Sequence, residues 1–195
     1  LFLIPLDNQG YWYRYHHLFS DLLQMRFSHG GHNKIKSLQD KASQWFEENG
    51  CTKEAIEYSL QAGNHKRTVQ LFDLYIDDIL KIDGNSLVWN WLSKIPEEII
   101  LGVPGLNIIK AWYFFSLGHM DSSESHLKAA EECLSQNVLT KNSPFSTDKD
   151  NWFRGKISAL RATIDAHSGN VPGIIENSHK AMKFLPPGDM ESRST

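Results

Sequence analysis

The sequence has only two cysteines among its 195 residues, and Cys51 and Cys133 lie far apart in the chain. Two distant cysteines without a secretory leader predict reduced thiols and a cytoplasmic protein, not a disulfide-stabilised secreted domain. Neither has a neighbouring histidine or second cysteine that would lower its thiol pKa, so a cysteine nucleophile is not expected. Both are expected to be small core residues.

Long apolar runs and an excess of basic charge are missing as well. The longest apolar run, Trp112 to Leu117, is far too short to cross a bilayer, so no membrane association is expected. A net charge of −3 and a pI of about 6.3 exclude a basic DNA-binding surface. No GxxxxGK[ST] motif is present either, so this chain alone is not expected to bind ATP or ADP.

Catalytic and metal-binding patterns are also scarce. Adjacent carboxylates such as Glu97 and Glu98 point about 100° apart on a helix, so they do not form an acid–base pair. His29 and His32 have metal-like spacing, but no second pair of ligands lies near them, and a solvated linker is the preferred interpretation. The sequence therefore predicts that this stretch is not an enzyme.

What the sequence does contain is a β-like start followed by helices. Residues 2–6 and 11–15 are aromatic and branched runs on either side of a turn at residues 7–10, which predicts a β-hairpin. Residues 17–27 fit a short helix. Residues 28–33 break that helix, and we expect a domain boundary there.

The remaining chain has helical periodicity throughout. Apolar stripes separated by glycine turns predict helices from residue 35 to 96, one of them continuous over residues 69–80. In the second half, Gly118 and Gly169 are 51 residues apart, and so are Ala130 and Ala181. This register predicts two copies of a helical hairpin, with a polar loop over residues 135–150 as an insertion and with more repeats after the end of the chain.

These patterns predict a mainly α fold, with a short β-hairpin followed by antiparallel helical hairpins of a tetratricopeptide-like α-solenoid. Three regions are expected. They are the hairpin with its following helix at 1–28, helical arm repeats at 34–101, and tetratricopeptide-like repeats at 102–195. Within the last region, residues 111–117 are apolar almost all round, which predicts contacts on two sides, one with a neighbouring repeat and the other with an inducer or a partner protein.

The most informative stretch is residues 13–19, Tyr-Arg-Tyr-His-His-Leu-Phe. It places Arg14, His16 and His17 just before or at the start of a helix, where unpaired N–H groups and the positive end of the dipole favour anions. The stretch therefore suits phosphate sensing. The alternative is that both histidines pack the hairpin against its helix and that Arg14 forms an ion pair with Asp7.

The string LFLIPLDNQGYWYRYHHLFSDLL resembles the end of the winged-helix module in MalT-like regulators. These are the large ATP-binding members of the LuxR family and belong to the signal-transducing ATPases with numerous domains. The segment SLQDKASQWFEENGCTKEAIEYSLQAGNHKRTVQLF is similar to the helices that follow in that family. The resemblance implies that region 1–28 is the C-terminal part of a winged-helix domain and that region 102–195 begins a sensor domain. It further implies a nucleotide-binding domain before this stretch, a DNA-binding domain after it, and slow ATP hydrolysis by the full-length protein.

The resemblance also implies roles for individual residues. Tyr15 to Leu18 matches a Met-His-Asp-Leu-like string in spacing, which puts His16 at the position that touches the phosphate of ADP and His17 where relatives have aspartate. In this scheme ADP held by His16 keeps the arm folded back. Inducer binding at the repeats then favours ATP exchange, opening at a hinge near residues 29–33, and oligomerisation.

Two other classes of function remain open at this point. One is a tetratricopeptide-type scaffold that binds a protein or peptide without nucleotide. The other is the sensor region of a multidomain signalling kinase or cyclase. The sequence preceding such a region would distinguish them, because a P-loop indicates the nucleotide switch, a kinase HRD motif the enzyme, and further repeats the scaffold.

Overall fold

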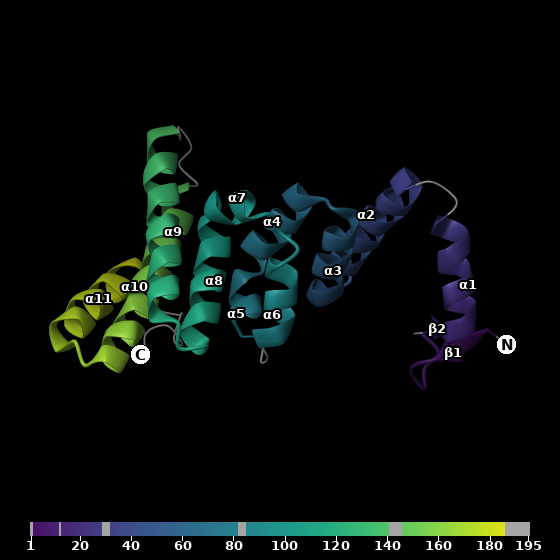
Figure 1. Ribbon diagram of the computed structural model, residues 1–195, viewed down its shortest axis with the longest axis horizontal. Coiled ribbons are helices and arrows are strands. Elements are labelled where there is room, and N and C mark those ends of the chain that lie inside the picture. Colours follow the sequence, from purple (N-terminus) through teal and green to yellow (C-terminus); the bar gives the residue numbers. More distant parts are fainter. Residues whose placement is uncertain (1, 12, 29–31, 82–84, 141–145, 186–195) are drawn as a thin grey trace. The chain divides into compact units, whose positions relative to one another are not determined.

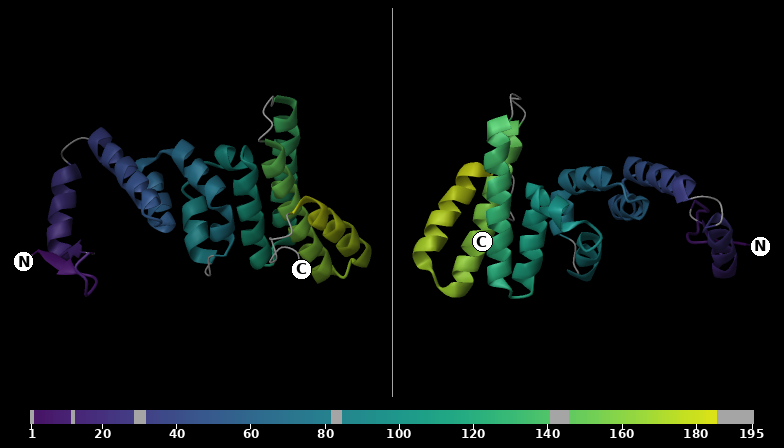
Figure 2. Two further views of the ribbon diagram at one scale, coloured as in Figure 1. Left: turned by 180° about the vertical axis from the view of Figure 1, so that it is seen from behind. Right: turned by 45° about the horizontal axis from the view of Figure 1, so that its top comes forward.

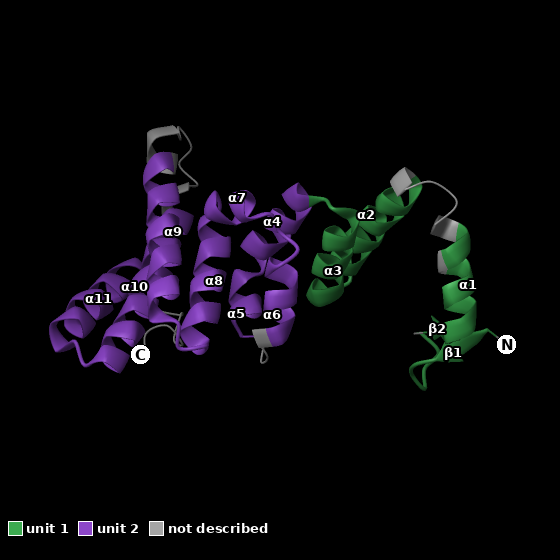
Figure 3. Ribbon diagram, viewed as in Figure 1, with its two compact units in different colours: residues 1–64 green, residues 65–195 purple. Residues whose placement is uncertain are grey.

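The computed structural model describes residues 2–11, 13–28, 32–81, 85–140 and 146–185, and the chain forms two compact units, 1–64 and 65–195 (Figure 3). The described chain is mainly α-helical with one two-stranded sheet, so the predicted fold class is confirmed (Figure 1). None of the described helices is long and apolar enough to span a bilayer. The three predicted regions, 1–28, 34–101 and 102–195, remain a prediction.

Unit 1 begins with the predicted hairpin. Strands β1 (Leu3–Pro5) and β2 (Tyr13–Tyr15) pair antiparallel and precede helix α1 (His17–Ser28). Phe19 of α1 stacks on Phe2 with ring centroids 4.7 Å apart and meets the edge of Tyr15 at 5.3 Å. These aromatic contacts hold the hairpin against the first turns of α1.

The rest of unit 1 is an antiparallel helix pair, α2 (His32–Glu48) and α3 (Thr52–Ala62). The two helices approach closely where small residues face each other. There the fully buried Ser43 donates its hydroxyl to the carbonyl of Ala55 at 2.7 Å. Farther along, Phe46 and Tyr58 stack with ring centroids 5.3 Å apart. The helices and the glycine turn between them follow the predicted pattern.

Unit 2 opens with four short helices, namely α4 (His65–Leu74), α5 (Ile76–Leu80), α6 (Asn85–Leu92) and α7 (Glu97–Leu101). The continuous helix expected over residues 69–80 is wrong, because the chain breaks at Tyr75, whose φ of −111° and ψ of 25° leave the helical region. No glycine or proline marks this break. Asp73 before the break and Asp77 after it form ion pairs with lysines of α10. Contacts with so distant a helix cannot be predicted from the local periodicity of residues 69–80.

Unit 2 continues with two helical hairpins, α8 (Pro104–Ser116) with α9 (Met120–Thr140) and α10 (Ser146–Ser168) with α11 (Val171–Phe184) (Figure 2). Helix α10 also contacts α8 and α9, so the hairpins stack. The loop expected over residues 135–150 is wrong. Residues 135–140 contain no glycine or proline, so α9 continues through them, and α10 already begins at Ser146.

The repeat register is visible in the two hairpin turns. Gly118 and Gly169 have φ values of +77° and +72°, a left-handed conformation that glycine adopts without steric penalty. In each turn the residue after glycine donates its N–H to the carbonyl five residues earlier, at 2.9 Å in both cases, which defines a Schellman motif. Ala130 and Ala181, the other matched pair, are both buried. The predicted pair of hairpins is confirmed.

Candidate functional sites

His16 occupies the junction between β2 and α1. Its backbone N–H donates to the carbonyl of Phe2 at 2.8 Å, which extends the strand pairing by one residue. Its carbonyl accepts the N–H groups of Phe19 at 2.9 Å and Ser20 at 3.0 Å, so it also accepts the first hydrogen bonds of the helix. Both backbone groups are satisfied, and the imidazole is therefore held at the positive end of the α1 dipole.

The two adjacent imidazoles lie close together. His16 is half-buried, His17 is exposed, and their ring centroids are 4.3 Å apart with an interplanar angle of 31°. Within the described part of the chain, neither ring forms a hydrogen bond. The pair thus places unpaired N–H donors beside a helix N-terminus, an arrangement suited to an anion.

Arg14 lies on the strand that precedes the histidine pair. It is exposed, pairs in register with Ile4, and points to the face opposite Tyr13 and Tyr15. The alternative ion pair with Asp7 does not occur in the described residues, where Asp7 instead accepts the backbone N–H of Tyr11 at 3.0 Å. No described hydrogen bond joins Arg14 to either imidazole, so the structure brings together the two histidines but not the arginine.

In unit 2 the aromatic run of α8 has the predicted contacts on two sides, but helices of this chain occupy both of them, and an inducer or partner at this run remains a prediction. On one side, Tyr113 stacks on Trp89 of α6 with centroids 4.6 Å apart. On the other, Phe115 meets the edge of His167 of α10 at 5.1 Å. Helix α8 is therefore the central element that joins the short helices of unit 2 to its second hairpin.

A polar network that sequence reasoning missed lies along α8. The fully buried Asn107 donates its amide to the carbonyls of Ile100 at 2.7 Å and Val103 at 3.1 Å, while its oxygen lies 3.0 Å from Nδ1 of His126. Burial, and secondly the nearby Lys110 ammonium, lower the pKa of His126. The network ties the α7–α8 corner to α9. Its only sequence signal is a polar residue within an apolar helix stripe.

The cysteines occupy different environments from those expected. Both Cys51 and Cys133 are half-buried, so the expectation of core positions is wrong. Burial raises the pKa of the Cys133 thiol, and this thiol donates to the carbonyl of Leu101 at 2.8 Å. A thiol with a raised pKa is a weak nucleophile at neutral pH, so Cys133 is a poor candidate for covalent catalysis.

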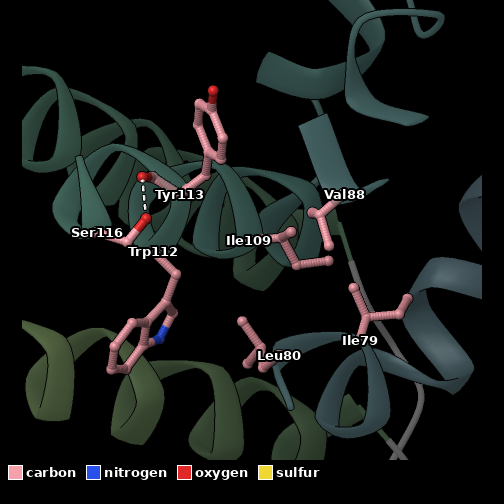
Figure 4. A pocket seen from close by; sticks show the side chains of 7 residues that line it. All are labelled: Ile79, Leu80, Val88, Ile109, Trp112, Tyr113 and Ser116. Carbon is pink, nitrogen blue, oxygen red and sulfur yellow. Dashed lines mark hydrogen bonds between the residues drawn. The ribbon is translucent and has the colours of Figure 1, made fainter. Parts of the chain in front are cut away.

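A pocket of about 210 Å³ opens between α5, α6 and α8 (Figure 4). Its walls are mostly apolar and aromatic, and sequence reasoning did not identify it. The lining residues are Ile79, Leu80, Val88, Ile109, Trp112, Tyr113 and Ser116.

Within the described ranges, no group of three histidine, cysteine or acidic residues is placed to hold a metal ion. His29 and the side chain of His32, the weak metal pattern of the sequence, lie outside what the structure describes.

Comparison with known proteins supports the resemblance found in the sequence. Residues 1–35 match the family model of the MalT winged helix domain. The chain is 26% identical over 196 residues to the HTH-type transcriptional regulator MalT of Klebsiella pneumoniae strain 342, covering 99% of this chain and 20% of that protein. MalT of Cronobacter sakazakii is 24% identical over 196 residues, with the same coverage.

A second kind of relative is similar over nearly the same length. The serine/threonine-protein kinase PknK of Mycobacterium tuberculosis strain H37Rv is 27% identical over 190 residues, covering 96% of this chain and 17% of the kinase. The chain thus spans about a fifth of the length of the curated relatives that it matches. No solved structure matches it.

Proposed function

We propose that this chain is the nucleotide-sensing junction and helical arm of a MalT-like, ATP-dependent transcriptional regulator. The match of residues 1–35 to the MalT winged helix domain and the similarity to MalT along 99% of the chain support this proposal. The ATPase and DNA-binding domains lie outside the chain in this scheme. The chain itself contributes contacts to ATP or ADP held by the neighbouring nucleotide-binding domain.

The position of His16 carries the proposal. A half-buried imidazole at a helix N-terminus, with no hydrogen-bond partner in the described chain, can donate to a phosphate oxygen while the helix dipole favours the negative charge. His17, whose ring lies 4.3 Å away, provides a second donor to the same anion. Arg14, exposed on the preceding strand, supplies a guanidinium for a more distant phosphate oxygen.

Nucleotide state is coupled to the helical repeats in the proposed mechanism. ADP bound by His16 favours a closed arrangement of the arm, and an inducer or partner protein bound at the repeats favours an open arrangement that oligomerises. Each ligand must prefer one arrangement for such coupling to exist. The proposed hinge, near residues 29–33, lies largely outside the described residues.

The decisive experiment measures ADP retention by the intact protein after gel filtration. We expect His16→Ala to lower retention about ten-fold or more, because loss of a charge-assisted hydrogen bond costs about 1.5–3 kcal/mol. His16→Gln, which keeps an N–H donor, should retain more ADP than His16→Ala. His179→Ala removes an exposed imidazole from α11 and should leave retention unchanged. Equal retention by the wild type and His16→Ala would exclude the sensor role.

The similarity to PknK favours a second candidate function. A chain 27% identical to a serine/threonine kinase over 96% of its length could regulate a kinase domain instead of an ATPase. In that case the histidine pair would be structural, and ADP retention by the intact protein would not depend on His16. The sequence that precedes the hairpin decides between the two, since a P-loop supports the regulator and an HRD motif supports the kinase.

A further inference from the structure

The pocket between α5, α6 and α8 has walls made of side chains that pack against the rest of unit 2. Ile79, Val88 and Ile109, which line one end, are all less than 10% exposed and belong to the core of unit 2. At the other end, Trp112 is fixed by an edge contact with Phe115 at 5.7 Å, and Tyr113 by its stack on Trp89. Because these side chains are already packed, the pocket exists without a ligand.

The pocket also contains an unused hydrogen-bond donor. Figure 4 shows the indole nitrogen of Trp112 on the edge of the ring that faces Leu80, across the pocket. This N–H has no acceptor in the part of the chain that the structure describes. By contrast, the hydroxyl of Ser116 already donates to the carbonyl of Tyr113 at 2.7 Å. A half-buried N–H without a partner favours a ligand that brings an acceptor.

The size and charge of the pocket restrict the ligand further. An apolar cavity of about 150 Å³ holds benzene, so about 210 Å³ holds one aromatic ring with a short substituent. None of the seven lining side chains carries a formal charge at neutral pH. A phosphate or carboxylate would therefore lose part of its hydration without gaining a counter-charge, which disfavours anions.

From these observations we infer that the pocket binds a small neutral molecule with one aromatic ring and one hydrogen-bond acceptor. The indole N–H of Trp112 donates a hydrogen bond to that acceptor. The inference assigns a ligand class to the helical repeats, and in that respect it rests on the proposed function. The binding itself requires neither nucleotide nor His16. Failure of one proposal can therefore be distinguished from failure of the other.

The test is an NMR titration of the 195-residue chain with acetophenone, which has an acceptor, and with ethylbenzene, which has the same shape without one. We expect both to bind, with acetophenone about five-fold tighter, the effect of one net hydrogen bond. Acetophenone alone should shift the Trp112 indole N–H resonance downfield. Benzoate, a charged molecule of similar size, should bind at least ten-fold more weakly than acetophenone.

Three variants separate the pocket from non-specific binding. Trp112→Phe keeps an aromatic wall without the donor, so the preference for acetophenone should disappear while ethylbenzene still binds. Leu80→Phe fills the pocket and should weaken both ligands, and circular dichroism verifies that it folds. Trp152→Phe removes an indole N–H outside the pocket and should leave the five-fold preference intact. Absence of saturable binding, or an unchanged preference in Trp112→Phe, would overturn the inference.

Discussion

At the scale of single residues, Arg161 binds two carboxylates of unit 2 at once. Its guanidinium binds both oxygens of Glu124 at 2.8 and 3.1 Å and both oxygens of Glu131 at 2.6 and 3.0 Å. Burial alone would lower the pKa of Arg161, but the hydrogen bonds and charges of the two carboxylates outweigh burial and raise it. The side chain is only 21% exposed, so solvent screens these pairs less than it screens pairs on the open surface.

Replacement of this arginine should therefore destabilise the protein measurably. We expect Arg161→Ala to lower the free energy of unfolding by about 1–3 kcal/mol, because it leaves two neighbouring carboxylates on α9 without their shared cation. Urea unfolding followed by circular dichroism gives this value. The control is Lys180→Ala, which removes an exposed pair with Glu176 on α11 and should change stability by less than about 0.5 kcal/mol. Equal effects of the two variants would contradict the prediction.

At the scale of elements, the two helical hairpins carry a cation at an equivalent position, although the side chains differ. Lys110 and Arg161 are 51 residues apart, like the turn glycines, and each cation binds acids on a preceding helix. Lys110 binds Glu97 of α7 at 2.6 Å, whereas Arg161 binds acids of α9. The first helix of each hairpin therefore attaches to the helix before it through an equivalent position, and the Arg161 pairs join the second hairpin to the first.

The equivalence of the turns leads to a matched prediction. Gly118→Ala and Gly169→Ala should each destabilise unit 2 by about 1–2 kcal/mol, the penalty for an L-residue in the left-handed region. An added Cβ meets no atom within 4 Å at either position, so the penalty comes from the backbone alone. Gly102→Ala serves as the control, because its φ of −83° suits alanine, and it should stay within about 0.5 kcal/mol. Thermal unfolding of the three variants measures the difference, and unequal effects at Gly118 and Gly169 would argue against equivalent turns.

At the scale of the whole molecule, unit 2 has a hydrophobic core of its own. Trp91 of α6 is completely buried and meets Phe72 of α4 in an edge contact at 6.1 Å. Leu106 and Leu127, from the first long hairpin, are also completely buried. With a core and a length typical of an autonomous domain, unit 2 has what independent folding requires.

Residues 65–195 should consequently fold alone. We expect the isolated fragment to be helical and to unfold in one cooperative transition, with Trp91→Ala lowering its stability by about 3–5 kcal/mol because that change opens a large cavity. Circular dichroism during thermal and urea unfolding makes both measurements. Met182→Ala, at a largely exposed position on α11, is the control and should have a much smaller effect. A broad transition, or one that Trp91→Ala does not shift, would show that unit 2 lacks an independent core.

Features encoded by neighbouring residues could be predicted from the sequence alone. The hairpin at residues 3–15, the start of α1, the turns at Gly118 and Gly169 and the 51-residue register all depend on short-range rules of periodicity and backbone sterics. The adjacency of His16 and His17 at a helix start is likewise a local property. Their proposed role in nucleotide sensing goes beyond local pattern and remains a prediction.

Only the tertiary structure decided the features that join distant residues. The break at Tyr75 and the lysines that bind Asp73 and Asp77 involve α10, more than 70 residues away. The sequence around Asn107 gives no sign of its contact with His126, which forms because the two helices pack together. The pocket beside Trp112 exists because three helices meet there. Burial and long-range hydrogen bonding depend on how the chain folds back on itself, and a pattern that repeats every few residues contains no information about it.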